Sequence, residues 1–239
     1  MLFAGAAPVS ALGMSVGVNT WYTTFDISPS GGEDVDPGFL YGPVIGLDWG
    51  KNWSLTSVLL TGNFKHHSPD TSVPVFNERR YDSDTTLNYS INKWLKVFGG
   101  FKYSRFDAHE SLNADEYGRL LMPFEQGNSR FISYGPGAGI GISLPLADSL
   151  FVVGNFSLLY LVGKETEPAG MGLENKRFTD TGFNTTVQLA YYLDSYSTTL
   201  LAGVRYQYFK EEYSNSEAKF AFLGVTVSAI YHFSLGGEE

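Results

Sequence analysis

The chain has 239 residues, no cysteine and a formal net charge of −9. Its length suits one domain or one large all-β unit, and the lack of cysteine excludes disulfides, thiol nucleophiles and thiolate metal sites. The negative charge disfavours a nucleic-acid partner, and no segment approaches the length of apolar sequence that a membrane-spanning helix needs.

The first eleven residues are small and apolar and do not alternate in polarity. Within them, Val9-Ser10-Ala11 has the small-residue pattern of a signal-peptide cleavage site. We therefore expect residues 1–11 to be the remnant of a signal peptide and the mature chain to begin near Leu12. The alternative is a disordered apolar leader.

From residue 13 onward, apolar residues alternate with polar or small ones in segment after segment. A period of two is the pattern of a β-strand with two different faces. The alternation predicts ten strands, at about 13–25, 38–49, 53–64, 80–91, 95–106, 131–144, 150–163, 178–193, 198–210 and 224–233. The third of these is apolar on both faces, so its orientation stays ambiguous.

The fourth strand separates its faces most clearly in the interior of the chain. One face carries aliphatic, aromatic and hydroxyl side chains, at Tyr81, Ser83, Thr85, Leu87, Tyr89 and Ile91. The other is wholly polar, at Arg80, Asp82, Asp84, Thr86, Asn88 and Ser90. A fully polar face on such a strand fits the lumen of a membrane barrel better than a soluble core.

The connections alternate between short and long along the chain. Short turns are expected around Gly50, Asn92, Ala147 and Asp194, and longer polar loops elsewhere, above all at 107–129 and 164–177. Short turns on one side and long loops on the other are typical of outer-membrane barrels, and an even strand count places both chain ends in the periplasm.

The last strand carries the most specific signal. Leu223, Val225, Val227 and Ala229 alternate with small or polar residues, Ile230 is an exception, and the strand ends on Tyr231-His232-Phe233. It resembles the C-terminal signature of Gram-negative small outer-membrane β-barrel proteins, such as the OmpA, OmpX and OmpW types. In that family the terminal Tyr-x-Phe strand is read by the assembly machinery and closes the barrel. Residues 234–239 follow Phe233 here, whereas the family usually ends on the phenylalanine.

The resemblance implies an all-β fold, a closed antiparallel up-and-down transmembrane β-barrel over residues 12–233, with a short periplasmic tail at 234–239. About ten strands are expected, and eight or twelve are possible. The implied location is the cell outer membrane, with lipid, lipopolysaccharide and the barrel-assembly machinery as partners. The implied function is non-enzymatic: structural, adhesive or a narrow passive pore, with a possible extracellular ligand at the outer loops.

A soluble periplasmic β-sandwich or a lipocalin-like binder is the alternative fold. It is disfavoured because the predicted outward faces carry so many aliphatic and aromatic side chains. Five tyrosines on these faces suit the aromatic belts at membrane interfaces, namely Tyr22, Tyr41, Tyr89, Tyr160 and Tyr191.

The inward faces predict a polar network in the lumen, because buried charges need partners. Keeping the apolar faces of strands four and five outward places Asp84 opposite Lys102, and the same rule places Asn184 opposite Gln207. The predicted network comprises Arg80, Asp82, Asp84, Lys102, Asp180, Asn184, Arg205 and Gln207. It either plugs the barrel or lines a narrow water path. Alternate glycines at 135–141 leave room for bulky groups of the opposite wall, for which Trp21 is a candidate.

One catalytic alternative is kept, because the ten-stranded omptin proteases use an Asp-x-Asp pair and an Asp-x-His pair near the outer rim. This chain has Asp82-Ser83-Asp84 and Asp107-Ala108-His109. A histidine base could activate water beside such acids. However, the expected register puts Asp107 beside Arg79 on the neighbouring strand, rather than across a cleft. We therefore expect no enzyme activity.

No metal or cofactor is expected. His66 and His67 are adjacent, so their side chains point apart, and we interpret both as solvated loop residues. The first long loop carries Asp26, Glu33, Asp34 and Asp36, which would hold a weak cation at most and are interpreted as a solvated acidic loop.

Overall fold

A computed structural model describes residues 12–28, 34–67, 76–110, 128–166, 176–214 and 216–234. The strands are β1 (Gly13–Ser28), β2 (Asp34–Trp49), β3 (Trp53–His67), β4 (Phe76–Ser90), β5 (Leu95–Glu110), β6 (Asn128–Ala147), β7 (Leu150–Thr166), β8 (Lys176–Leu193), β9 (Thr198–Glu212) and β10 (Glu217–Ser234). One short 3₁₀ turn, η1 (Asp194–Tyr196), joins β8 to β9. Within the described ranges, no helix has the length and apolar character to cross a membrane.

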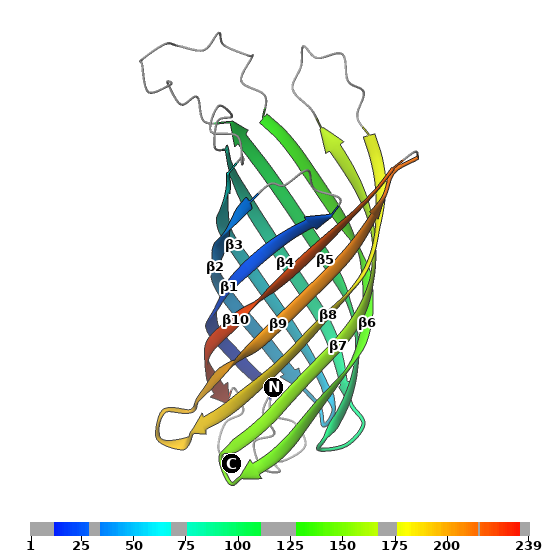
Figure 1. The fold of residues 1–239 in the computed structure, drawn as a ribbon. Coiled ribbons are helices and arrows are strands. Elements are labelled where there is room, and N and C mark those ends of the chain that lie inside the picture. Colours follow the sequence, from blue (N-terminus) through cyan, green and yellow to red (C-terminus); the bar gives the residue numbers. More distant parts are fainter. Residues whose placement is uncertain are drawn as a thin grey trace, which may run out of the picture.

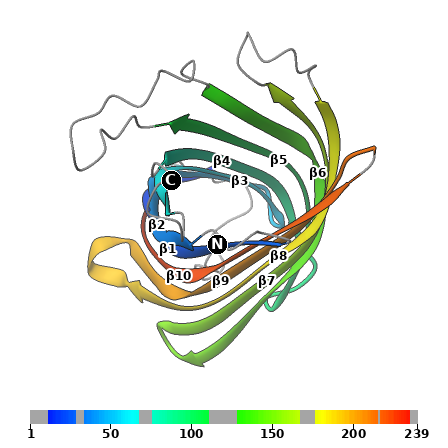
Figure 2. The ribbon, with the colours of Figure 1, turned by 45° about the horizontal axis from the view of Figure 1, so that its top comes forward.

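The ten strands form one closed antiparallel barrel in which neighbours in sequence are neighbours in space, as Figures 1 and 2 show. β1 pairs with β10 from Gly13 opposite Ser234 to Ser28 opposite Lys219, and this pairing closes the ring. The predicted fold and strand count are therefore confirmed. In a ring of ten, each strand lies opposite the one five places away, so β4 faces β9 and β1 faces β6.

The four connections expected to be short, around Gly50, Asn92, Ala147 and Asp194, lie together at one end of the barrel, at the bottom of Figure 1, beside the paired ends of β1 and β10. By analogy with outer-membrane barrels, we call this the periplasmic end and the opposite end the outer end. The gap predicted between the strands at 198–210 and 224–233 is too long, because β9 extends to Glu212 and β10 begins at Glu217. At these ends both strands consist mainly of polar and charged residues, so apolar and polar positions do not alternate and the strand cannot be recognised from the sequence.

Other strands also run further at the outer end than alternation predicts. β2 begins at Asp34, within the predicted acidic loop, and β3 continues to His67. Pro37 lies in β2 at a register irregularity between Asp36 and Phe39, where its missing N–H breaks no ladder bond. Near the opening of a barrel both faces of a strand contact water, so the alternation of apolar and polar residues ends before the backbone pairing does.

The outer wall is apolar around the whole ring. Exposed large hydrophobic side chains come from all ten strands, and the five tyrosines expected in belts, Tyr22, Tyr41, Tyr89, Tyr160 and Tyr191, all point outward. An exposed apolar surface of this extent requires a lipid or protein cover. The wall is therefore suited to a bilayer.

The inner face carries its own apolar cluster, towards the outer half of the lumen. Trp21, Phe25, Leu40, Leu60, Phe64, Leu161, Phe209 and Phe222 form it. Leu60 and Phe64 come from β3, whose outward face also carries large hydrophobics such as Leu59. This explains why β3 is apolar on both faces: one contacts the lipid side of the wall, and the other packs inside the barrel.

Candidate functional site: the lumenal network

A buried guanidinium bridges the lumen in its outer half. Arg80 Nη2 donates to Asp82 Oδ2 on its own strand and to Gln207 Oε1 on β9, each at 2.8 Å. Because β4 and β9 are opposite strands, the second bond crosses the full width of the barrel. Arg80 and Gln207 have no solvent exposure, so water does not reach them along the lumen.

Aromatic rings surround the rest of the Arg80 guanidinium. Its Cζ lies 4.1 Å from the ring centre of Phe222, 5.2 Å from that of Phe106 and 5.4 Å from that of Trp21. Arg80 Nε and Nη1 are buried and have no hydrogen-bond partner among the described residues. Cation–π attraction therefore replaces part of the hydration that this group loses.

Two further cations complete the network. Lys102 Nζ donates to Asp82 Oδ1 and, at 3.1 Å, to Asp84 Oδ1. The register places Lys102 directly opposite Asp84. Arg205 on β9 donates to Asp84 Oδ2 across the lumen at 2.9 Å and to Asn184 Oδ1 at 3.0 Å.

Asp180 is the one predicted network residue that lies apart. No hydrogen bond joins it to the other seven within the described chain, and it is buried on β8 opposite Glu211. The structure brings the remaining seven together. Sequence reasoning missed their aromatic partners Phe106 and Phe222: Phe222 lies before the predicted start of the last strand, and Phe106 is the last residue of the predicted fifth strand.

The two acidic motifs of the omptin alternative lie on different faces of the wall. Asp82 and Asp84 point into the lumen, where Lys102 binds both. Asp107 sits opposite Arg79 in the register and is bound by Arg105 and Arg130, with 2.9 Å between Arg130 Nε and Asp107 Oδ1. Inward positions on β5 are even-numbered, such as Lys102 and Ser104, so the alternation places Asp107 on the outward side, where it pairs with the two arginines and is only 7% exposed.

His66 is a correction to the sequence analysis. It lies in β3 with an exposed fraction of only 3%, and its Nε2 is 3.1 Å from Glu78 Oε2. The side chain points inward next to Phe25, in line with the alternation of β3. His67 is also in β3. Its side chain lies outside the described residues.

The predicted acidic loop is largely strand. Asp26 belongs to β1, and Asp34 and Asp36 belong to β2, while Glu33 lies outside the described residues. No group of three or more histidine and acidic side chains with the geometry of a metal site occurs in the described ranges. The predicted signal-peptide remnant at 1–11, most of the predicted tail, at 235–239, and the connections at 29–33, 68–75, 111–127 and 167–175 also lie outside the described residues.

The glycines of β6 accept side chains from the flanking strands. A Cβ at Gly139 would meet Phe98 of β5 at 2.6 Å, and one at Gly137 would meet Leu159 of β7 at 2.6 Å. The expected filler from the opposite wall, Trp21, instead packs against Phe222 and the Arg205 guanidinium. Neighbouring side chains lie closer to a glycine than any group reaching across the barrel.

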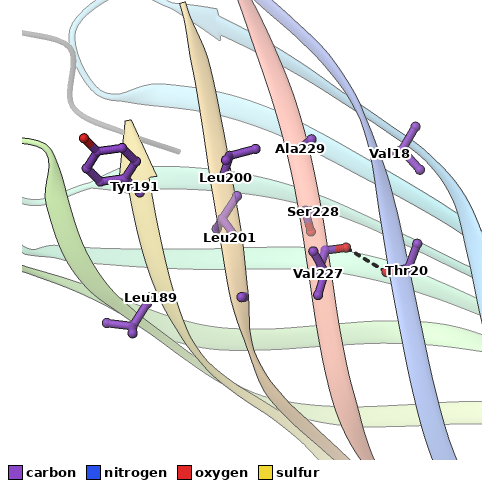
Figure 3. A pocket seen from close by; sticks show the side chains of 10 residues that line it. Val18, Thr20, Leu189, Tyr191, Leu200, Leu201, Val227, Ser228 and Ala229 are labelled. Carbon is purple, nitrogen blue, oxygen red and sulfur yellow. Dashed lines mark hydrogen bonds between the residues drawn. The ribbon is translucent and has the colours of Figure 1, made fainter. Parts of the chain in front are cut away.

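A groove of about 480 Å³ lies on the outward side of β1, β8, β9 and β10, shown in Figure 3. Small side chains such as Ala202 and Ala229 form its floor, between larger ones such as Val18 and Leu189. Thr20 Oγ1 is not a free polar group there, because it donates to the Val227 carbonyl at 3.1 Å. The groove is therefore part of the apolar wall.

No protein-family model and no curated protein matches the sequence. Among solved structures, the β domain of the Bordetella autotransporter BrkA is 12% identical, with a TM-score of 0.51 over 94% of this chain and 100% of that one. The outer membrane protease OmpT from Escherichia coli is 13% identical, with a TM-score of 0.51 over 94% of this chain and 95% of that one. At these identities the likeness concerns the fold. The chain has the fold of an outer-membrane β-barrel.

Proposed function

We propose that this protein is a non-catalytic outer-membrane β-barrel whose lumen is sealed in its outer half. Its role is then structural or adhesive rather than that of a pore. Any recognition of an extracellular ligand falls to the outer loops at 111–127 and 167–175. Outer-membrane lipid and lipopolysaccharide are its surroundings, and the barrel-assembly machinery reads its last strand at Tyr231 and Phe233.

The complete burial of side chains at the lumen axis carries this proposal. Trp21, Leu40, Phe64, Arg80 and Gln207 come from five different strands, and none is exposed to solvent. Bonds from β4 to β9 hold this layer from both sides. A water-filled pore needs a continuous path of exposed polar side chains, and this layer offers none among the described residues.

The test is single-channel recording of refolded protein in a planar bilayer. We expect no discrete conductance steps from protein whose heat-modifiable migration in detergent shows a folded barrel, because the sealed layer leaves no ion path. Regular open steps from the same folded sample, reduced by replacing Arg80 or Arg205, would contradict the proposal and indicate a pore.

We also expect no peptidase activity. Lys102 binds both Asp82 and Asp84, and Asp107 pairs with Arg105 and Arg130 on the other face of the wall, so these acids do not line one cleft in which water could be activated. Cleavage of fluorogenic peptides by the folded protein is predicted to equal that of an Asp84→Asn, His109→Ala double variant. Turnover that the double variant lacks would favour the omptin-like alternative.

A further inference from the structure

A chamber lies below the sealed layer, on its periplasmic side. Its volume is about 230 Å³, and the network residues Asp84, Lys102 and Arg205 line its upper part. A second cavity of about 50 Å³ shares Val44 and Ile230 with it and extends to Asp48 and His232 near the periplasmic end. The chamber therefore continues towards the periplasm and stops at the network.

Lys96 on β5 projects into this chamber without a counterion. Within the described residues it forms no ion pair or hydrogen bond, and its Nζ lies 5.7 Å from the ring centre of Phe98. The side chain lies over Gly141 of β6, where any Cβ would collide with it. The glycine thus provides the space that the lysine stem occupies.

The charges around the chamber do not balance. The network above it combines three cations, Arg80, Lys102 and Arg205, with two carboxylates, Asp82 and Asp84. Lys96 adds a fourth cation in the chamber wall. Within the network and Lys96 the cations exceed the carboxylates by two, and counting Asp48 of the second cavity leaves an excess of one positive charge across the two cavities, where an unpaired charge is costly. Such a site favours an anion.

Apolar side chains form only part of the remaining wall, which also carries polar residues such as Asn155 and Thr186. Phe98, Leu159 and Leu201 line the chamber, and the first two cover the β6 glycines. The volume is below the usual 300–1,000 Å³ or so of ligand pockets, so only a small molecule fits. We propose that the chamber binds a small monocarboxylate from the periplasmic side, with its carboxylate on Lys96 and its short carbon chain against Phe98 and Leu159.

Calorimetric titration of the detergent-refolded barrel with sodium butyrate tests this proposal. We expect saturable binding at one site, weakened about tenfold or more in Lys96→Met, since a hydrogen bond to a charged group contributes about 1.5–3 kcal/mol. Lys96→Arg should retain most of the affinity. The matched control is Lys93→Met, which removes an exposed lysine from the adjacent turn and should leave binding unchanged.

Three results would overturn the proposal: no saturable binding by folded wild-type protein, equal binding by Lys96→Met, or equal binding of butyrate and inorganic phosphate. Equal binding of butyrate and phosphate would mean that the site selects for negative charge alone and that its apolar side chains do not contribute to binding. Neutral butyramide should bind at least tenfold more weakly than butyrate. The titration is independent of the bilayer recording, so a conducting barrel would leave this test intact.

Discussion

Replacing Arg80 with methionine is expected to lower the free energy of unfolding by about 3–5 kcal/mol, the usual cost of removing one partner from a buried ion pair. The change leaves Gln207 Oε1 without its donor and Asp82 with Lys102 alone. It also removes the cation from the three rings around it. Denaturant titration followed by heat-modifiable gel migration measures the effect.

Arg79→Met is the matched control, because Arg79 is the exposed neighbour on the same strand and bonds only Asn63 among the described residues. Its expected change is about 0.5 kcal/mol or less. If the two variants unfold at the same denaturant concentration, the bond between Arg80 and Gln207 does not stabilise the barrel, and the buried layer is not held in place by it.

Replacing Trp21 with alanine is expected to cost about 3–5 kcal/mol as well, through a different mechanism. Trp21 is completely buried, packs against Phe222 with 6.2 Å between ring centres, and lies 4.6 Å from Arg205 Cζ. Alanine leaves a cavity at the lumen axis and removes a ring from two guanidinium groups. The same denaturant titration measures the loss.

Trp94→Ala serves as the comparison for Trp21, because Trp94 is half exposed in the turn between β4 and β5. A change of about 0.5 kcal/mol is expected there. A comparable loss in both variants would show that tryptophan content alone, rather than lumen packing, determines the stability of the barrel.

The fold was predictable because the outward face of each strand must be apolar. That single requirement determines which face of each strand points outward and therefore which residues pair: Asp84 lies opposite Lys102, and Asn184 lies opposite Gln207, as predicted. The strand ends were not predictable, because near the opening of the barrel neither face of a strand has to be apolar. Asp34 and Glu217 read as loop residues and are strand residues.

The choice between a plug and a water path could not be made from the sequence. It depends on whether side chains from opposite walls meet, and strand periodicity carries no information on distances across the lumen. Arg80 and Gln207 are inward residues on β4 and β9, and only the closed ring shows that they touch. The sequence likewise does not reveal that Lys96 has no carboxylate bound to it among the described residues, because that depends on which side chains surround it in the folded barrel.

The bonds from Arg80 to Gln207 and from Arg205 to Asp84 also have a kinetic consequence. They join residues 127 and 121 positions apart, in the first and second halves of the chain. In an insertion intermediate with only the first strands formed, Arg80 would lack both its hydrogen-bond acceptor Gln207 and the ring of Phe222 from β10. Ring closure and charge burial must then occur as one late, cooperative event, and neither half of the sequence should persist as a stable intermediate.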